Sequence, residues 1–142
     1  METMTTFPLQ RDEVAGYLRE HGITPTRPRV EIGTVLFQGH QHLSADQVQA
    51  RLTSHVSKAS VYNTLSLFTE RGLLRQLIVD PTRVLYDTNV APHHHYYDVE
   101  RGELLDMDSS DALQMSPPAP PHGMAIESVD IIVRVRRDSA TH

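Results

Sequence analysis

Apolar residues in the first half of the chain recur at intervals of three or four, with polar residues between them, which is the spacing of amphipathic helices. Local signals mark the helix ends: Ser44 and Gln47 match the capping box that starts a helix, and Gly22 and Gly72 lie where helices commonly stop. The pattern therefore predicts four helices, over residues 9–21, 27–37, 44–53 and 57–71.

The predicted fourth helix has two chemically different faces. Val61, Leu65 and Phe68 share one side, whereas Lys58 and Tyr62 lie on another. A shorter helix precedes it across a three-residue turn, which is the helix-turn-helix arrangement.

Two β-rich segments, residues 73–79 and 83–87, follow this helix and are joined by Asp80-Pro-Thr82. Aspartate and proline favour a turn, so the segments predict a hairpin. Helices followed by a hairpin form a winged helix-turn-helix, and we assign residues 1–88 to a DNA-binding domain of this kind.

The second half of the chain predicts a smaller unit. Short strands are expected over residues 93–99, 103–107 and 126–136, with a helical turn over 109–115 and an extended proline-rich stretch over 116–123. So small a sheet with one apolar face hardly stands alone, so we expect it to pair with a second copy. The predicted class is α+β, an N-terminal winged helix-turn-helix followed by a small α/β dimerisation and ligand-sensing domain, residues 89–142.

Charge divides the chain unevenly. The net charge is −5, but residues 1–86 carry 9 Lys and Arg against 8 acidic residues, whereas residues 87–142 carry 4 against 10. DNA binding by the first half would therefore depend on a local basic patch. No cysteine is present, which excludes disulfides and thiolate zinc sites, including a structural zinc held by four cysteines. No apolar run is long enough for a membrane span, and we expect a soluble cytoplasmic protein.

The consecutive histidines His93, His94 and His95 are the candidate ligand site. On a strand, His93 and His95 project from the same face and His94 from the other. Carboxylates from the neighbouring strands and an imidazole before the third helix complete a mixed nitrogen and oxygen set suited to Fe, Mn or Zn. The predicted metal ligands are His42, Asp87, His93, His95 and Asp106.

Haem is the other ligand considered for the triplet His93, His94 and His95. Axial ligands approach haem iron from opposite sides, which neighbours on one strand cannot easily do, so haem would use one of these histidines and another group. The alternative without a ligand is three solvated histidines at a loop edge.

The outer face of the fourth helix carries side chains that suit DNA. Asn63 can pair bidentately with adenine, Ser60 and Tyr62 can contact bases or phosphates, and Lys58 can neutralise a phosphate. A solvated helix surface has the same composition, so this pattern alone is weakly specific. The predicted DNA-contact set is Arg27, Arg29, Lys58, Ser60, Tyr62, Asn63 and Thr64.

Several motifs together resemble a known family. Residues 59–65 (ASVYNTL) and 68–74 (FTERGLL) resemble the recognition helix of the ferric uptake regulator (Fur) superfamily, and residues 25–29 (PTRPR) and 42–46 (HLSAD) also match. Further motifs closely resemble its iron response regulator (Irr) branch, and the match covers residues 14–137. These motifs are residues 72–76, 86–90, 93–97, 103–106, 120–123 and 129–137.

The resemblance implies a homodimeric winged-helix transcription factor that binds double-stranded DNA at AT-rich, pseudo-palindromic operators and responds to iron, through haem in the Irr branch. By position, His42, Asp87, His93, His95 and Asp106 match the regulatory metal ligands of the superfamily. The histidine triplet matches the haem-associated motif of the Irr branch.

Two departures from the family pattern concern cysteine. Asp98 and Arg101 stand where many relatives have the first Cys-x-x-Cys pair of a structural zinc site, so packing must hold the dimer instead. The Cys-Pro motif of some Irr proteins is also missing. The resemblance thus implies an iron- or haem-responsive regulator of iron and haem metabolism genes.

Three other functions remain open. The first is an Mn- or Zn-responsive Fur-type repressor. The second is a haem- or metal-binding module without operator binding. The third is a metalloenzyme, which we do not expect because no residue near the triplet is an obvious general base.

Overall fold

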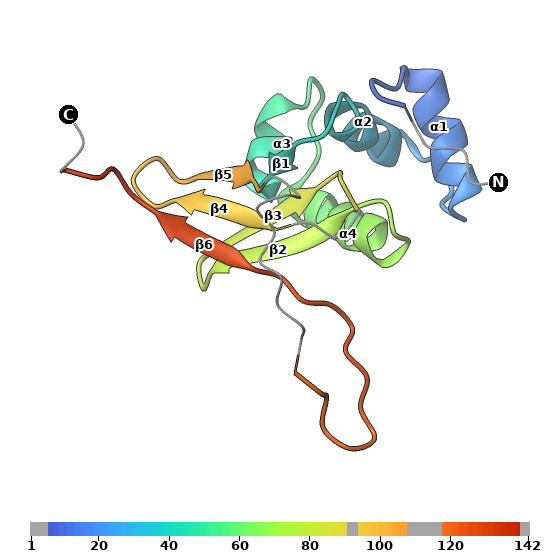
Figure 1. Cartoon of the computed structure of the whole chain (residues 1–142). Coiled ribbons are helices and arrows are strands. Elements are labelled where there is room, and N and C mark those ends of the chain that lie inside the picture. Colours follow the sequence, from blue (N-terminus) through green and yellow to red (C-terminus); the bar gives the residue numbers. More distant parts are fainter. Residues whose placement is uncertain (1–5, 91–93, 108–117, 140–142) are drawn as a thin grey trace. The chain divides into compact units, whose positions relative to one another are not determined.

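The computed structural model describes residues 6–90, 94–107 and 118–139, and the chain divides into two compact units, residues 1–90 and 91–142 (Figure 1). Each unit contains one three-stranded sheet, and the helices of the described residues all belong to the first unit. The predicted α+β class is confirmed. None of the helices in these ranges has the length and apolar character needed to cross a bilayer.

The four predicted helices are present, and their caps follow the sequence signals. Ser44 Oγ accepts the Gln47 backbone N–H at 3.2 Å while Gln47 Oε1 accepts the Ser44 N–H at 2.9 Å, which completes the capping box. Gly72 adopts a φ of 81° after the fourth helix, in the left-handed region that glycine enters without strain. The helices are α1 (Arg11–Glu20), α2 (Arg27–Leu36), α3 (Ala45–Arg51) and α4 (Lys58–Glu70).

The core of the first unit is built on the apolar face of α4. Val61, Leu65 and Phe68 are all at most 1% exposed. The rings of Phe68 and Phe37 stack with centroids 6.0 Å apart, which joins α4 to the end of α2. The opposite face of α4 is thereby left toward solvent.

The predicted hairpin consists of β2 (Arg75–Asp80) and β3 (Arg83–Asp87). Its turn is closed by Asp80 Oδ1, which accepts the Thr82 N–H at 2.8 Å. The sheet also contains a strand that we did not predict, β1 (His42–Leu43), and the strand order is β1-β3-β2 with antiparallel pairing. A two-residue strand has no periodicity of its own, and only its pairing with β3 defines it.

The second unit has the strands β4 (His95–Asp98), β5 (Glu103–Asp106) and β6 (Ile132–Val135), in the order β5-β4-β6. β5 pairs antiparallel with β4, and β6 pairs parallel with it. The strand predicted over residues 126–136 is too long, because its ladder with β4 begins only at Ile132. Val129 lies before that ladder and is 44% exposed. The helical turn predicted over 109–115 lies outside the described residues.

Candidate metal ligands and nucleic-acid surface

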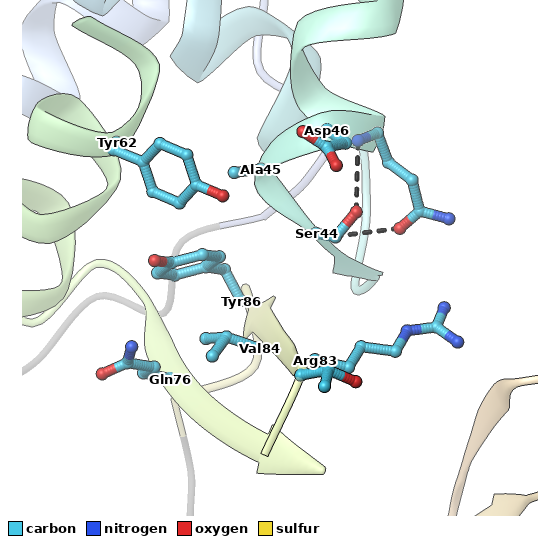
Figure 2. Close-up of a pocket in the computed structure, with 10 residues that line it drawn as sticks. Ser44, Ala45, Asp46, Tyr62, Gln76, Arg83, Val84 and Tyr86 are labelled. Carbon is cyan, nitrogen blue, oxygen red and sulfur yellow. Dashed lines mark hydrogen bonds between the residues drawn. The ribbon is translucent and has the colours of Figure 1, made fainter. Parts of the chain in front are cut away.

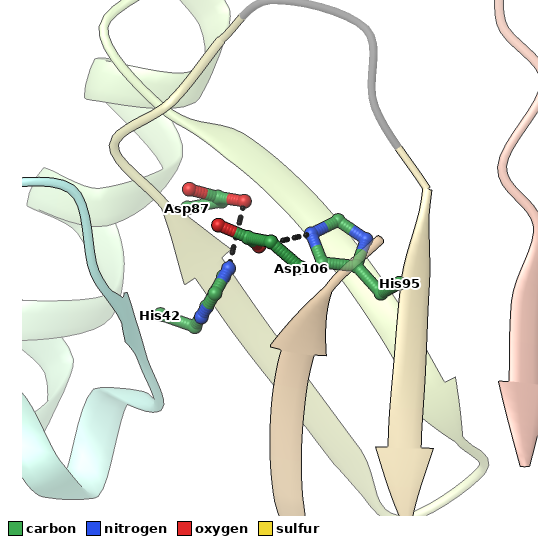
Figure 3. A group of neighbouring side chains, drawn as sticks. All are labelled: His42, Asp87, His95 and Asp106. Atoms are coloured by element: carbon green, nitrogen blue, oxygen red, sulfur yellow. Dashed lines mark ion pairs between the residues drawn. The ribbon is translucent and has the colours of Figure 1, made fainter. Parts of the chain in front are cut away.

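In the first unit, His42 and Asp87 form a close pair on neighbouring strands. They are cross-strand partners in the β1–β3 ladder, so their side chains leave the sheet on the same side. His42 Nε2 lies 3.2 Å from Asp87 Oδ2 (Figure 3), and the side chains are 17% and 1% exposed. The second carboxylate oxygen, Oδ1, accepts the Asn89 backbone N–H at 2.8 Å, which fixes the carboxylate.

In the second unit, His95 and Asp106 form a pair of the same kind. They are opposite each other in the β4–β5 ladder, and His95 Nε2 lies 3.4 Å from Asp106 Oδ1 (Figure 3). The imidazole is 1% exposed and the carboxylate 50% exposed. A buried histidine ring is thus held on one edge by a carboxylate that solvent can reach.

The atom spacing within each pair suits two neighbouring ligands of one ion. Ligand atoms about 2.1 Å from a metal, separated by the angles of octahedral or tetrahedral geometry, lie about 3.0–3.4 Å apart. The spacing is 3.2 Å for His42 and Asp87 and 3.4 Å for His95 and Asp106. Each pair also combines one imidazole and one carboxylate, a donor set that suits Fe, Mn or Zn.

The remaining histidines of the triplet bear on the haem hypothesis. His93 lies outside the described residues. His94 is half-buried, and its Nδ1 accepts the Ile131 backbone N–H at 3.2 Å, so one ring nitrogen is already used. His95 is buried beside Asp106. In each described histidine one ring nitrogen already faces a protein group, Ile131 N–H for His94 and Asp106 for His95, so their surroundings add no support for haem.

Asp98 closes the end of β4 in place of a cysteine. Its Oδ1 accepts the backbone N–H groups of Glu100 at 3.0 Å and Arg101 at 3.1 Å, and its Oδ2 lies 3.0 Å from Arg137 Nη2. These contacts, with the N–H of Arg101 foremost, hold the pKa of Asp98 below its usual value despite burial. A carboxylate and its donors therefore occupy the position for which the resemblance implies a zinc-binding cysteine.

The outer face of α4 carries most of the predicted DNA contacts. Lys58, Tyr62 and Asn63 are exposed, and Ser60 is partly exposed. Thr64 differs, because it is 6% exposed and lies on the core side of the helix with Val61. We therefore correct the prediction for Thr64, since a buried side chain cannot meet DNA from this position.

The two predicted arginines lie at the start of α2 and differ in exposure. Arg27 is exposed, and its Nε donates to Glu31 Oε1 at 3.2 Å. Arg29 is half-buried, and its Nη1 donates to the Thr24 carbonyl at 3.0 Å. Both guanidinium groups are thus held by an oxygen acceptor close to the helix start.

A cavity of about 520 Å³ opens between the start of α3, Tyr62 of α4 and the hairpin (Figure 2). Tyr86 lines the cavity, and burial raises the pKa of this phenol, with a further contribution from Tyr62. Gln76 is the cross-strand partner of Tyr86 and also lines the cavity. Gln76 and Tyr86 were not predicted from the sequence, because strand register alone brings them beside Tyr62 of α4.

A peroxide-responsive repressor and two ferric uptake regulators are among the known proteins to which this chain is similar. The peroxide-responsive repressor PerR of Staphylococcus aureus (strain Mu50) is 29% identical over 98 residues, which are 67% of this chain and 66% of PerR, slightly less than two thirds of its length. The structure of the ferric uptake regulator from Pseudomonas aeruginosa with manganese is similar, with a TM-score of 0.66 and 25% identity over 87% of this chain and 97% of that one.

A third similar protein is the ferric uptake regulator from Francisella tularensis with iron, with a TM-score of 0.66 and 26% identity over 85% of this chain and 96% of that one. The profile of the ferric uptake regulator family matches residues 20–134, which is most of the chain. This match shows that the protein belongs to the ferric uptake regulator family.

Proposed function

We propose that the protein is a transcriptional regulator whose affinity for operator DNA is controlled by a divalent transition metal. In this proposal the first unit binds double-stranded DNA through α4, and the second unit carries the contacts of a homodimer. Family membership and the exposed polar face of α4 support DNA binding. Similarity to regulators solved with manganese and with iron supports a metal as the effector.

One observation carries the proposal. His42 and Asp87 belong to the same sheet as the hairpin, and the next pair in their ladder is Leu43 with Tyr86. Tyr86 in turn lines the cavity that contains Tyr62 of α4. A metal bound by His42 and Asp87 would therefore stabilise the sheet that carries Tyr86, which lies across the cavity from Tyr62 of α4. A ligand that binds one conformation of a protein more tightly shifts the population toward that conformation.

We extend the proposed ligand set to the second pair, so that His42, Asp87, His95 and Asp106 bind one ion. The positions for which the sequence resemblance implies metal ligands support this extension. His93 remains a predicted ligand from the sequence. Metal titration counts the sites: one ion per chain supports a shared ion, whereas two ions per chain would assign the pairs to separate sites.

Duplex binding by the metal-stripped full-length protein tests the function. Fluorescence anisotropy is measured on an AT-rich pseudo-palindromic duplex and on a scrambled duplex of equal composition, without metal and with Mn²⁺, Zn²⁺ or, anaerobically, Fe²⁺. We expect the effective metal to change affinity for the first duplex by about 5- to 150-fold, the usual range of coupling between two sites. Equal, metal-independent affinity for both duplexes would contradict the proposal.

The assignment to the iron response regulator branch, with haem as the effector, rests on the sequence resemblance. Titration of the full-length protein with haem tests it through the absorption spectrum and operator affinity. A histidine-ligated spectrum that is lost in His93→Ala or His94→Ala, together with altered operator affinity, supports that branch. An unchanged spectrum and affinity favour the Mn-, Fe- or Zn-responsive alternative.

A further inference from the structure

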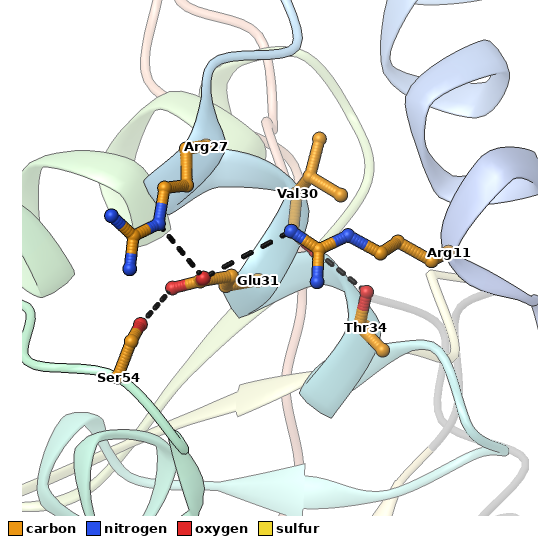
Figure 4. A network of polar contacts seen from close by, with 6 residues as sticks. All are labelled: Arg11, Arg27, Val30, Glu31, Thr34 and Ser54. Atoms are coloured by element: carbon orange, nitrogen blue, oxygen red, sulfur yellow. Dashed lines mark hydrogen bonds and ion pairs between the residues drawn. The ribbon is translucent and has the colours of Figure 1, made fainter.

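Glu31 of α2 is the centre of a polar cluster that joins three segments of the first unit (Figure 4). Its Oε1 accepts Arg27 Nε–H at 3.2 Å and lies 4.0 Å from Arg11 Nη2, at the start of α1. Its Oε2 accepts the hydroxyl of Ser54, which lies in the turn between α3 and α4. One carboxylate therefore contacts α1, α2 and the turn before α4.

The environment of Glu31 keeps this carboxylate charged. The hydrogen bond from Ser54 is the main cause of a lowered pKa, with Arg27 and Arg11 adding to it against the opposing effect of burial. The side chain of Glu31 is 13% exposed, whereas those of Arg27 and Arg11 are 72% and 65% exposed. The acid is thus covered while its arginine partners reach solvent.

The contact with Arg27 uses only part of its guanidinium group. Glu31 accepts the Nε–H (Figure 4), and neither Nη group of Arg27 makes a hydrogen bond within the described residues. A guanidinium group presents five N–H donors in a planar fork, so a bidentate contact with a second anion remains open to it. Phosphate is the anion that suits this geometry in a DNA-binding unit.

The cluster also fixes the position of the Arg27 guanidinium group relative to α4. Ser54 is three residues before Ser57, the N-cap of α4, whose side chain accepts the Ser60 N–H at 3.1 Å. Through Glu31, Arg27 is thereby tied to the segment that leads into α4. In helix-turn-helix proteins the N-terminal residues of the second helix approach the bases, so phosphates lie close to this end.

We propose that Glu31 is a positioning residue for DNA binding, which holds Arg27 through Nε so that its Nη groups meet a backbone phosphate beside the N-terminal end of α4. This inference rests on the proposed DNA-binding function. It assigns a binding role to a negatively charged residue, which simple electrostatics would place among the residues that weaken DNA binding.

The test compares Glu31→Gln with wild type in duplex binding over a range of salt concentrations. Removal of a negative charge near DNA should by itself tighten binding, whereas loss of the positioning role should weaken it. We expect Glu31→Gln to bind about 3- to 10-fold more weakly, with a slope of log affinity against log salt that is smaller by about 0.9, the loss of one phosphate contact. The double variant with Arg27→Ala should bind like Arg27→Ala alone.

Glu20→Gln is the matched control, because Glu20 is an exposed glutamate at the end of α1 and the charge change is the same. It should keep the wild-type slope. The Arg27 Nε–H resonance in ¹⁵N NMR spectra provides a readout without DNA, and we expect slow exchange in wild type and fast exchange in Glu31→Gln. Ser54→Ala, which removes the hydrogen bond from Ser54 to Glu31, should also lower duplex affinity. This variant replaces Glu31→Gln in the test if Glu31→Gln does not fold.

Two outcomes would overturn the inference while leaving the proposed function intact. In the first, the wild type binds the duplex, and Glu31→Gln binds it with an equal or higher affinity and an equal or larger salt slope. The other is an Arg27 Nε–H that exchanges equally fast in both proteins. If wild type itself binds no duplex, the proposed function fails and the inference fails with it.

Discussion

His42 and Asp87 are opposite each other in the β1–β3 ladder, with His42 Nε2 3.2 Å from Asp87 Oδ2. β1 has only two residues, so few backbone hydrogen bonds hold it on the sheet. A metal shared by the two side chains would add a strong link to a weak strand pairing. In the proposed function this makes the edge of the sheet sensitive to metal.

His42→Ala should therefore weaken metal binding. Loss of outer-shell partners alone costs about 10- to 100-fold in metal affinity, and we expect removal of a direct ligand to cost at least as much. Competition with a fluorescent chelator measures the change. His40→Ala is the matched control, since His40 is exposed and two residues away. Equal losses in both variants, or none in His42→Ala, would refute the assignment of His42.

Bound metal should also stabilise the folded protein. A ligand at 100 times its Kd that binds only the folded state stabilises it by about 2.7 kcal/mol. Thermal unfolding of the metal-stripped protein, with and without Mn²⁺ or Zn²⁺, should show a Tm that rises with metal concentration. The rise should shrink in His42→Ala and persist in His40→Ala. A Tm independent of metal in wild type would count against a specific site.

Asn63 and Lys58 should affect DNA binding in different ways. Asn63→Ala should cost about 1–3 kcal/mol at one adenine position and leave affinity for the scrambled duplex nearly unchanged, because base contacts carry sequence information. Lys58→Ala should weaken both duplexes and reduce the salt slope by about 0.9. Ser66→Ala, an exposed change later on α4, should do neither. If Lys58→Ala lost the preference for the operator duplex and Asn63→Ala kept it, Lys58 and not Asn63 would be the base-reading residue.

The sequence predicted those features that neighbouring residues determine. The capping box of Ser44 and Gln47 and the buried face of Val61, Leu65 and Phe68 depend on contacts within one helix or on its period. The closeness of His42 to Asp87 and of His95 to Asp106 depends on strand register, and it was expected only through motif positions and the resemblance.

Features that depend on distant pairing were missed. β1 exists only through its ladder with β3, and β6 is shorter than its alternating pattern because β4 pairs only with Ile132–Val135. Glu31 was overlooked because two of its partners, Arg11 and Ser54, lie on other segments. The burial of Thr64 could have been predicted from the sequence, because Thr64 is three residues after Val61 and this spacing places both on the same helix face.

Asp98 should make the stability of the second unit depend on pH. The pKa of Asp98 is lowered in the folded state, so its contribution is fully present above the usual aspartate pKa of about 3.9 and is lost as the pH falls through the folded value. Asp98→Asn should therefore lower the Tm at pH 7 and have a diminishing effect below about pH 4. Thermal unfolding across this range measures the difference, with the exposed Glu103→Gln as control. A difference that grows as the pH falls would show that the charge on Asp98 opposes folding, contrary to its contacts with Arg101 and Arg137.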